Sequence, residues 1–368
     1  MVSKSLKEVV LKPITGEWGT EGNNVQILRT TNFTNEGRVN YLKVVERNVD
    51  SNKIEKKKLK IGDIIIEKSG GSPKQPVGRV VFFEKEGVFL CNNFTAILRP
   101  NLDDVVPKYL LYILYCNHKF GFTSAYQNKT TGIINLQLPK YLEGTKIPLP
   151  PLDQQKKIAA ILDAADAYRQ KTKALIEKYD ELTQSLFLDM FGDPITNPKG
   201  WEIKTLNDVC FKITDGTHHS PTPQESGYPY VTAKHVKPFS LQFDAKPSYV
   251  DEKAHNEIYK RCTPEYGDVL YIKDGATTGI ACINTFKEPI SMLSSLALLK
   301  LNDNINNQYL CHWLNHNGIK QKLISEFMSG AAIKRYTLKK IKLFKLMVPI
   351  IDLQNQFSER VQAIEAQK

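Results

Sequence analysis

The chain has 368 residues, a formal net charge of +11 and a hydrophobic content of 41%. This length suits two domains of ordinary size, and this composition excludes a largely disordered chain. No apolar run reaches the ~18 residues of a membrane span, and the N-terminal residues lack the apolar core of a signal peptide.

The charge distribution indicates a class of binding partner, and the cysteines indicate a cellular compartment. Lys and Arg outnumber Asp and Glu in residues 1–151 and 193–368, but not in 152–192. Basic flanking segments suggest a polyanionic partner, nucleic acid first, although a merely soluble basic protein has the same charge. The six cysteines are scattered without a C-x-x-C pair, which predicts reduced, mostly buried thiols in a cytoplasmic protein.

The first predicted segment recurs in the second half of the chain. "LKEVVLKPITG" at 6–16 and "LNDVCFKITDG" at 206–216 share a Leu, an acidic residue, a Val, a Lys and the final Gly. Four further pairs of segments are separated by a similar number of residues, between 199 and 205. They are 60–71 with 265–276, 107–118 with 307–318, 130–142 with 330–342, and 150–158 with 349–357. This pattern predicts a tandem duplication of one α+β domain, with copies at 1–149 and 201–348 and a helix after each.

Three polar segments of the first copy are candidates for binding nucleic acid. Base reading requires directed donors and acceptors on positioned loops, and phosphate binding requires Lys, Arg and hydroxyl groups. The loops "EKSGGSPKQPVGR" and "YQNKTTG" offer such side chains at Lys68, Ser69, Lys74, Gln75, Arg79, Asn128, Lys129, Thr130 and Thr131. "KIEKKKLK" at 53–60 is either a phosphate-binding patch or the charged edge of a strand.

Residues 150–192 are predicted to form one long helix. No Pro or Gly occurs from Gln154 to Asp189, and from Ala165 apolar residues recur at alternating steps of three and four. Such a seam requires a partner helix along its length. Its members include Ile158, Leu162, Ala165, Leu175, Tyr179, Leu182 and Leu186. Gly and two prolines in "FGDPITNPKGW" end the helix, and residues 193–200 are the predicted linker.

The second copy carries its own candidate side chains in three loops. The segments "DGTHHSPTPQ", "IKDGATTG" and "AAIKRYT" offer His218, His219, Lys273, Thr277, Thr278, Lys334, Arg335 and Tyr336. His312 and His316 lie four apart on a predicted helix, but no further ligands at sensible spacing accompany them, so no metal site is predicted.

A second helix is predicted over 349–368, as the natural partner of the long seam. It carries Leu353, Phe357 and Val361, but the sequence ends at Lys368 and this helix has about half the length of the first. We therefore expect part of the long seam to face another chain, or the gene to be truncated.

The central stretch "IPLPPLDQQKKIAAILDAADAYRQK", followed by "LTQSLFLDMFGDPITNPKGW", resembles the conserved region of the specificity subunits of type I restriction–modification systems. The resemblance covers nearly the whole chain. It implies an α+β fold with two tandem-duplicated target-recognition lobes separated by a long coiled-coil-type helix, and a second, shorter helix at the C-terminus. The shortness of that second helix departs from the family pattern.

The resemblance also implies a non-catalytic reader of DNA in a phage-defence complex. Each lobe would read one half of a bipartite, asymmetric double-stranded DNA target, and the helices would set the spacing of the lobes. The helices would also dock two adenine methyltransferase subunits, and the assembly would recruit restriction subunits. The protein would need no cofactor of its own, because S-adenosylmethionine, ATP and Mg²⁺ are used by those partners. Self-association through the unpaired seam remains open.

Catalytic interpretations find little support in the residues. The Asp/Asn-Pro-Pro-aromatic signature of adenine methyltransferases is absent, and Asp50, Glu55 and Lys57 have nuclease-like spacing only within a Lys-rich polar stretch. Two alternatives remain: the recognition subunit of another methylation-based defence enzyme, and an oligomeric assembly protein that binds no DNA.

Overall fold

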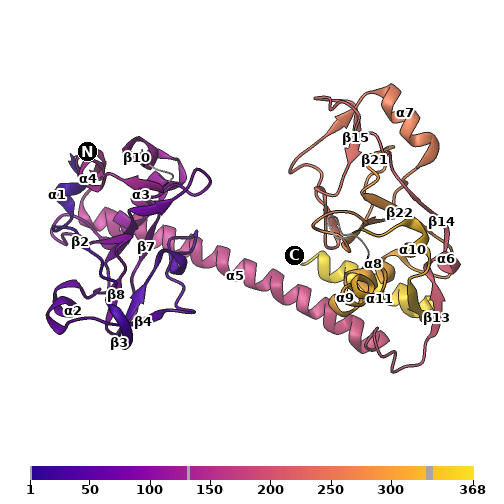
Figure 1. The fold of residues 1–368 in the computed structure, drawn as a ribbon, viewed down its shortest axis with the longest axis horizontal. Helices are drawn as coiled ribbons and strands as arrows, with labels where there is room; N and C mark the ends of the chain where they lie inside the picture. The colour runs from indigo at the N-terminus through magenta and orange to yellow at the C-terminus, as the bar shows by residue number, and fades with distance from the viewer. Residues whose placement is uncertain (1, 131–132, 329–334) are drawn as a thin grey trace. The chain divides into compact units, whose positions relative to one another are not determined.

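The computed structural model describes residues 2–130, 133–328 and 335–368, and the chain divides into two compact units (Figure 1). Unit 1 extends to Gln170 and unit 2 runs from Lys171 to Lys368. The division falls inside one continuous helix, α5 (Leu152–Phe191). Within the described ranges, no helix is long and apolar enough to cross a membrane.

Unit 1 packs short sheets against α3 (Pro107–Lys119) and α4 (Leu138–Gly144). A sheet of order β2-β9-β5-β7 forms its centre, and three smaller groups, β4-β3-β8, β10-β11-β6 and β1-β12, surround it. The strands are β1 (Val2–Ser5), β2 (Ile14–Thr15), β3 (Thr20–Leu28), β4 (Val45–Asn48), β5 (Ile64–Glu67), β6 (Ser69–Gly71), β7 (Val80–Phe82), β8 (Phe89–Cys91), β9 (Thr95–Leu98), β10 (Gln127–Thr130), β11 (Ile133–Leu136) and β12 (Lys146–Leu149). Strands β5, β7 and β9 are buried throughout, because other elements cover both their faces.

Unit 2 repeats this plan. The sheet β14-β22-β19-β20 matches the centre of unit 1, the parallel pair β15 and β21 matches β3 and β8, and β13-β23 matches β1-β12. Its strands are β13 (Glu202–Thr205), β14 (Cys210–Asp215), β15 (Tyr228–Val231), β16 (Val236–Lys237), β17 (Ser240–Leu241), β18 (Tyr249–Val250), β19 (Val269–Ile272), β20 (Ala281–Ile283), β21 (Ser291–Met292), β22 (Leu296–Leu301) and β23 (Lys345–Val348). Its further helices are α6 (Leu206–Val209), α7 (Glu252–Arg261), α8 (Asn307–Asn315), α9 (Asn317–Phe327), α10 (Leu338–Lys342) and α11 (Ile351–Glu365). The predicted α+β duplication is therefore confirmed.

The first repeated segment has the same local structure in both units. Each begins with a one-turn helix, α1 (Leu6–Val9) or α6, closed by a capping box. The backbone N–H of Ser5 donates to the Glu8 carboxylate at 2.7 Å, and that of Thr205 donates to Asp208 at 2.8 Å. These reciprocal bonds satisfy amides that a helix start leaves unpaired.

The glycine that ends this segment is required by close backbone approach. A Cβ on Gly16 would lie 2.0 Å from the Asn92 carbonyl oxygen, and one on Gly216 would lie 1.9 Å from that of Met292. Only glycine fits at such distances. Gly16 and Gly216 therefore recur because the backbone follows the same path in both units.

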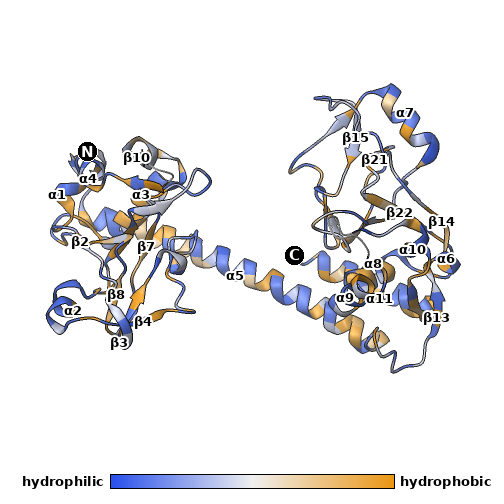
Figure 2. Ribbon diagram, viewed as in Figure 1, coloured by the Kyte–Doolittle hydropathy of each residue, from blue (hydrophilic) through white to orange (hydrophobic). Residues whose placement is uncertain are grey.

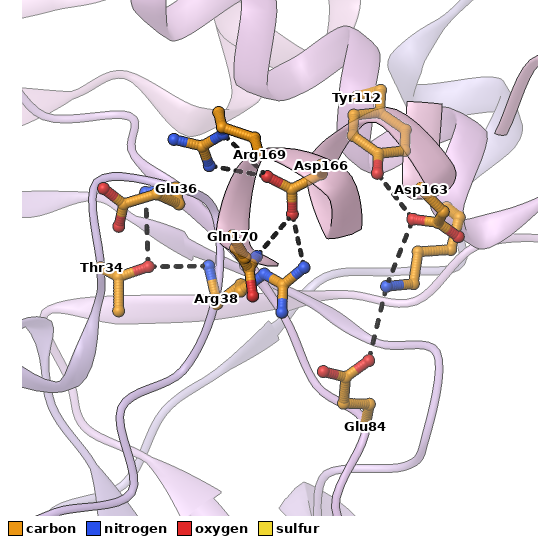
Figure 3. A network of polar contacts seen from close by, with 10 residues as sticks. Thr34, Glu36, Arg38, Glu84, Tyr112, Asp163, Asp166, Arg169 and Gln170 are labelled. Atoms are coloured by element: carbon orange, nitrogen blue, oxygen red, sulfur yellow. Dashed lines mark hydrogen bonds and ion pairs between the residues drawn. The ribbon is translucent and has the colours of Figure 1, made fainter. Parts of the chain in front are cut away.

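The N-terminal half of α5 is held on unit 1 by a polar network (Figure 3). The Asp163 carboxylate accepts a hydrogen bond from the Tyr112 hydroxyl at 2.6 Å, and Asp166 pairs with Arg38 and with Arg169. Burial raises the pKa of Tyr112, and Asp163 raises it further. Burial also opposes ionisation of Asp166, but hydrogen bonds from Arg169 and Arg38 outweigh it and lower the Asp166 pKa.

The C-terminal turns of α5 belong to the core of unit 2. Phe187 and Phe191 are buried there, and their rings pack against Tyr309 of α8 and Phe357 of α11 with centroids 4.8–5.7 Å apart. Lys368 also pairs with Asp180 of α5 at 2.6 Å. The C-terminal helix thus contacts α5, as predicted, but only along its last turns.

Between its two ends, α5 exposes much of the predicted seam. Ile158 and Leu186 contact the cores of units 1 and 2 respectively, and Leu353, Phe357 and Val361 pack in the core of unit 2. The seam residues that are exposed are Leu162, Ala165, Leu175 and Leu182, whereas Tyr179 is half-buried. Figure 2 shows hydrophobic stretches alternating with hydrophilic ones along α5. An amphipathic helix with its apolar residues in water is typical of a surface that another helix covers.

The segment "KIEKKKLK" requires a correction. Residues Ser51–Lys57 form a helix, α2, so the alternative of a charged strand edge was wrong, and the phosphate-binding alternative stays a prediction. Asp50 caps the start of α2, which explains the turn-to-helix transition there, and Lys57 pairs with Glu17 at 2.9 Å. The three residues with nuclease-like spacing have separate partners. Asp50 accepts from the Asn52 N–H, and Glu55 pairs with Lys58, whereas Lys57 pairs with Glu17.

Candidate nucleic-acid interface

In unit 1, the two candidate loops meet in one sheet. Strand β6 pairs with β11, which pairs with β10, so parts of the two loops form one three-stranded sheet, which we call the platform. The Ser69 hydroxyl donates to the Asn135 side chain across this sheet. Asn128 lies opposite Asn135 and is exposed. A short sheet positions side chains more rigidly than two independent loops would, which suits directed hydrogen bonding to bases.

The turn beside this platform carries two of the other candidates. Ser72 and Gln75 exchange backbone hydrogen bonds of 2.9 and 3.0 Å, which leaves Lys74 exposed at the turn. Lys68 is half-buried, and its backbone N–H donates to the Phe94 carbonyl at 2.9 Å.

Arg79 has partners inside the unit. Its Nε and Nη2 lie 2.8 and 3.1 Å from the two carboxylate oxygens of Glu67, and Nη2 also donates to the Thr30 carbonyl at 3.3 Å. Glu67 is 5% exposed. A bidentate pair with a buried carboxylate fixes the guanidinium and directs most of its donors inward. Arg79 therefore stabilises the unit beside the platform, and most of its donors do not face a ligand at the surface.

In unit 2, the candidate loops also converge. Asp274 and Arg335 form an isolated β-bridge, and the Tyr336 N–H donates to the Lys273 carbonyl at 2.8 Å. These bonds join the loop after β19 to the segment before α10, as β6 and β11 are joined in unit 1. Arg335 and Thr277 are exposed at this junction.

The third loop of unit 2 is linked to this junction by a buried carboxylate. Asp215, 3% exposed at the end of β14, lies 2.5 Å from the Arg261 guanidinium and 3.4 Å from the Lys273 ammonium. The His218 ring nitrogen Nε2 lies 3.5 Å from the same carboxylate. Lys273 is itself buried and also pairs with Asp274 at 3.3 Å. One carboxylate thus gathers three basic groups from separate elements, and Arg261 remains half exposed.

A hollow of about 560 Å³ opens beside this cluster, between the loop 217–222 and α7. His218, His219, Lys253 and Arg261 line it, together with Asp251 and Glu257. His219 is exposed, and its backbone N–H donates to the Thr217 hydroxyl at 3.1 Å. The hollow presents basic groups and hydrogen-bond donors at the surface, as a nucleic-acid contact requires.

Two candidate residues of unit 2 serve the fold instead. The ring of Tyr336 is 1% exposed and packs against Phe344 and Tyr271, so it cannot reach a ligand at the surface. Thr278 is 7% exposed and its hydroxyl donates to the Gly275 carbonyl within the same turn. We therefore remove both from the candidate interface.

Thr131 and Lys334 lie outside the described residues, and the backbones of Lys129 and Thr130 belong to β10.

The sequence reasoning missed Asp215, Arg261 and α7. The repeat could have indicated Arg261. Lys57 is the last residue of α2 and Arg261 is the last residue of α7, and their separation in sequence lies inside the range of the repeat offset. Each pairs with an acidic residue beside the repeated glycine, Glu17 next to Gly16 and Asp215 next to Gly216.

Other chemistry finds no geometric support. Across residues 2–130, 133–328 and 335–368, no three His, Cys, Asp or Glu side chains gather as a metal-binding set. All six cysteines are free, and only Cys116 is exposed. Burial raises the pKa of the Cys210 thiol to about 12, which keeps it protonated and poorly nucleophilic.

Comparison with known proteins gives consistent results over nearly the whole chain. A family model described as the type I restriction modification DNA specificity domain matches twice, at residues 20–179 and 198–368. A putative type I restriction enzyme specificity subunit, MjaX, of Methanocaldococcus jannaschii is 26% identical, over 98% of this chain and 85% of the relative. The EcoKI specificity subunit of Escherichia coli is 25% identical over 59% of this chain and 54% of its own. The crystal structure of an S subunit from M. genitalium has the same fold, with a TM-score of 0.60 at 16% identity, covering 100% of this chain and 89% of that one.

Proposed function

The chain belongs to the type I restriction modification DNA specificity domain family, and from this premise we propose that each unit reads one half of a bipartite DNA target through its convergent polar segments. The protein is a specificity subunit: it supplies DNA sequence recognition to a type I restriction–modification complex and is not itself catalytic. What remains to be assigned is which residues read DNA and how the complex is arranged.

The observation that carries the assignment of residues is the convergence of segments distant in sequence. In unit 1, β6 and the β10–β11 hairpin form one sheet, and in unit 2 the Asp274–Arg335 bridge joins the equivalent segments. The platform of unit 1 offers Lys68, Ser69, Lys74, Gln75 and Asn128. The junction of unit 2 offers His218, His219, Thr277 and Arg335, and we add Arg261 to this set. Lys273 is buried and supports these groups through its ion pair with Asp215.

Unlike chemistry in the two interfaces supports unlike half-sites. In unit 1 the sheet brings together a neutral amide pair, Asn128 and Asn135, and the hydroxyl of Ser69. In unit 2 charged groups gather around Asp215. Asn favours adenine and Arg favours guanine in the major groove. The two halves of the target should therefore differ, as expected of an asymmetric sequence.

The exposed seam of α5 supports a role in assembly. We propose that Leu162, Ala165, Leu175 and Leu182 lie against helices of two methyltransferase subunits or of another segment, and that α5 sets the spacing of the half-sites. A helix of 40 residues is about 60 Å long, at ~1.5 Å per residue. S-adenosylmethionine, ATP and Mg²⁺ would be bound by the methyltransferase and restriction subunits, in the cytoplasm.

Methylome sequencing tests the proposal directly. The gene is expressed together with its neighbouring methyltransferase gene, and adenine methylation is compared with that of a strain lacking this gene. We expect a motif of two short, unlike halves around a fixed gap to be methylated only when this chain is present. Methylation that does not depend on this chain, from a methyltransferase shown to be expressed, would contradict the proposal.

A further inference from the structure

A pair of exposed apolar side chains occurs at matched framework positions of the two units. In unit 1 the pair is Leu11 and Ile61, which are 52% and 61% exposed. In unit 2 it is Phe211 and Tyr266, which are 71% and 65% exposed. The offset between the matched residues falls in the range of the repeat, so the two pairs occupy the same place in the duplicated fold.

The pair in unit 1 surrounds a buried ion pair. The Leu11 N–H donates to the Arg99 carbonyl at 2.8 Å, and the Arg99 guanidinium lies 2.8 Å from the carboxylate of Asp63, two residues after Ile61. Asp63 is 1% exposed. A hollow of about 390 Å³ lies here, and Leu11, Ile61 and Arg99 all line it. The apolar side chains therefore stand at the rim of a preformed concave surface held by a rigid ion pair.

The pair in unit 2 also lies beside an ion-paired cluster, although its backbone contacts differ. Phe211 lies at an irregularity of β14, between Cys210 and Lys212, which face Leu301 and Lys300 of β22. A β-bulge re-aims the side chain it carries, here out of the sheet. The Lys300 ammonium lies 2.9 Å from the carboxylates of both Glu265 and Asp268, which flank Tyr266. The ion pair of Lys300 with Asp268 therefore takes the place of the Arg99–Asp63 ion pair of unit 1. The exposed side chains beside it, Phe211 and Tyr266, are aromatic.

The recurrence distinguishes this surface from ordinary exposed apolar residues. Single exposed apolar side chains are common and need no function. Here, however, both positions of the pair are apolar in both units, while the recognition segments of the same units differ in charge and hydrogen bonding. Double-stranded DNA is also a poor occupant, because its backbone binds cationic and polar groups. A surface repeated once per unit fits one kind of protein partner bound in two copies.

The charge beside the pair further specifies that partner. Lys12 follows Leu11 and Lys212 follows Phe211, and neither forms an ion pair within the described part of the chain. An apolar side chain next to a carboxylate on the partner would complement both surfaces. We propose that these two surfaces, Leu11–Lys12–Ile61 and Phe211–Lys212–Tyr266, each dock one methyltransferase subunit on its lobe, in addition to any contact along α5. This inference rests on the proposed function.

The stoichiometry of the complex tests the inference. The full chain is co-purified with the methyltransferase encoded beside it, and the mass of the complex is measured by native mass spectrometry. We expect two methyltransferase subunits on the wild-type chain, one on Leu11→Glu/Ile61→Glu, one on Phe211→Glu/Tyr266→Glu and none on the fourfold variant at limiting concentration. Each double variant should weaken its own site at least ~10-fold, because buried apolar and aromatic anchors dominate interface energies.

A matched control separates this effect from surface charge in general. Phe120 is 75% exposed, and the residue at the repeat offset from it is Lys320, so this apolar position is not shared by the units. Phe120→Glu should leave two subunits bound. Circular dichroism and DNA binding of the isolated chain should be unchanged in every variant, which excludes misfolding.

The remaining outcomes are distinguishable. Two bound subunits on the fourfold variant would overturn the docking surfaces and leave the proposed function intact. No bound subunit on the wild-type chain would overturn both. A wild-type chain that dimerises alone through these residues, with methyltransferase binding unaffected by the substitutions, would assign the surfaces to self-association and overturn the inference.

Discussion

Gln155 and Gln354 make the same hydrogen bonds at matched positions of the two units. Gln155, in the first turn of α5, accepts from the Val106 N–H at 2.9 Å and donates to the carbonyls of Asp104 and Pro150. Gln354, in the first turn of α11, accepts from the Asn306 N–H at 2.8 Å and donates to the carbonyls of Asn304 and Pro349. Both side chains are 0–1% exposed. One amide in each unit thus ties the following helix to the loop before α3 or α8.

Removing this amide should destabilise either unit. Gln155→Leu or Gln354→Leu leaves one N–H and two carbonyls without their partner, at a cost of ~1–3 kcal/mol or more in the free energy of unfolding. Chemical denaturation followed by circular dichroism measures it. Gln154→Leu, at the exposed neighbouring position, is the control and should change stability little. Equal stabilities for Gln155→Leu and Gln154→Leu would contradict the anchoring role.

Neutralising Asp215 should damage unit 2 selectively. Asp215→Asn removes the ion pair of Arg261 and one of the two ion pairs of the buried Lys273. The loss should lower the free energy of unfolding by about 3 kcal/mol. DNA binding should weaken as the basic groups lose their fixed positions. Denaturation and DNA titration measure the two effects, with exposed Asp303→Asn as control. The idea fails if Asp215→Asn binds DNA as tightly as the wild-type chain and discriminates both half-sites as well.

Phosphate contacts by Lys74 and Arg335 should appear in the salt dependence of DNA binding. Each contact releases counterions, so Lys74→Ala or Arg335→Ala should reduce the magnitude of the slope of log K against log salt by about 0.9. The variants should weaken binding to all sequences alike. Lys140→Ala, on the exposed face of α4, should leave the slope unchanged. An unchanged slope for both Lys74→Ala and Arg335→Ala would remove these residues from the interface.

His312 should make stability depend on pH below neutrality. Burial lowers its pKa to about 3, with a smaller contribution from Lys368, and its ring stacks on Phe239. The unfolded chain binds a proton near pH 6.5 and the folded chain does not, so the stabilisation is complete above pH 6.5 and declines as the pH falls toward 3. At pH 5 the loss is about 2 kcal/mol per such histidine.

Comparison with His312→Phe isolates this contribution. The difference in the free energy of unfolding between wild type and variant should change by ~2 kcal/mol between pH 7.5 and pH 5, measured by urea denaturation at each pH. Carboxylates titrate in both proteins and cancel in the difference. A difference that is independent of pH over this range would show that His312 is not held neutral.

A charge in the exposed seam should break assembly and leave the lobes folded. Leu182 is 50% exposed on α5, so Leu182→Glu places its carboxylate in water in the isolated chain and changes stability little. In a complex that covers the seam, the same carboxylate would be buried without a partner. Size-exclusion chromatography with the methyltransferase, and melting of the chain alone, measure the two effects. Normal assembly of Leu182→Glu would refute the seam as a partner surface.

The amino-acid sequence by itself determined the duplication, the long helix and the family. Local rules suffice for these: Gly16 and Gly216 end a repeated segment, Pro and Gly bound α5, and apolar residues recur with the helical period. The candidate loops were also found, because their polar residues lie between buried strands. In contrast, propensity alone did not show that the Lys-rich segment 53–60 starts in a helix capped by Asp50.

The tertiary structure decided which side chains face a ligand and which face the core. Tyr336 and Arg335 are neighbours in sequence, yet the Tyr336 ring is buried against Phe344 and Arg335 is exposed. Asp215 and Arg261 meet across 46 residues, and no local pattern pairs them. Burial and charge pairing are set by contacts between distant segments, which depend on the packing of the whole unit. Periodicity identifies elements and repeats, whereas the chemistry of a site requires the three-dimensional arrangement.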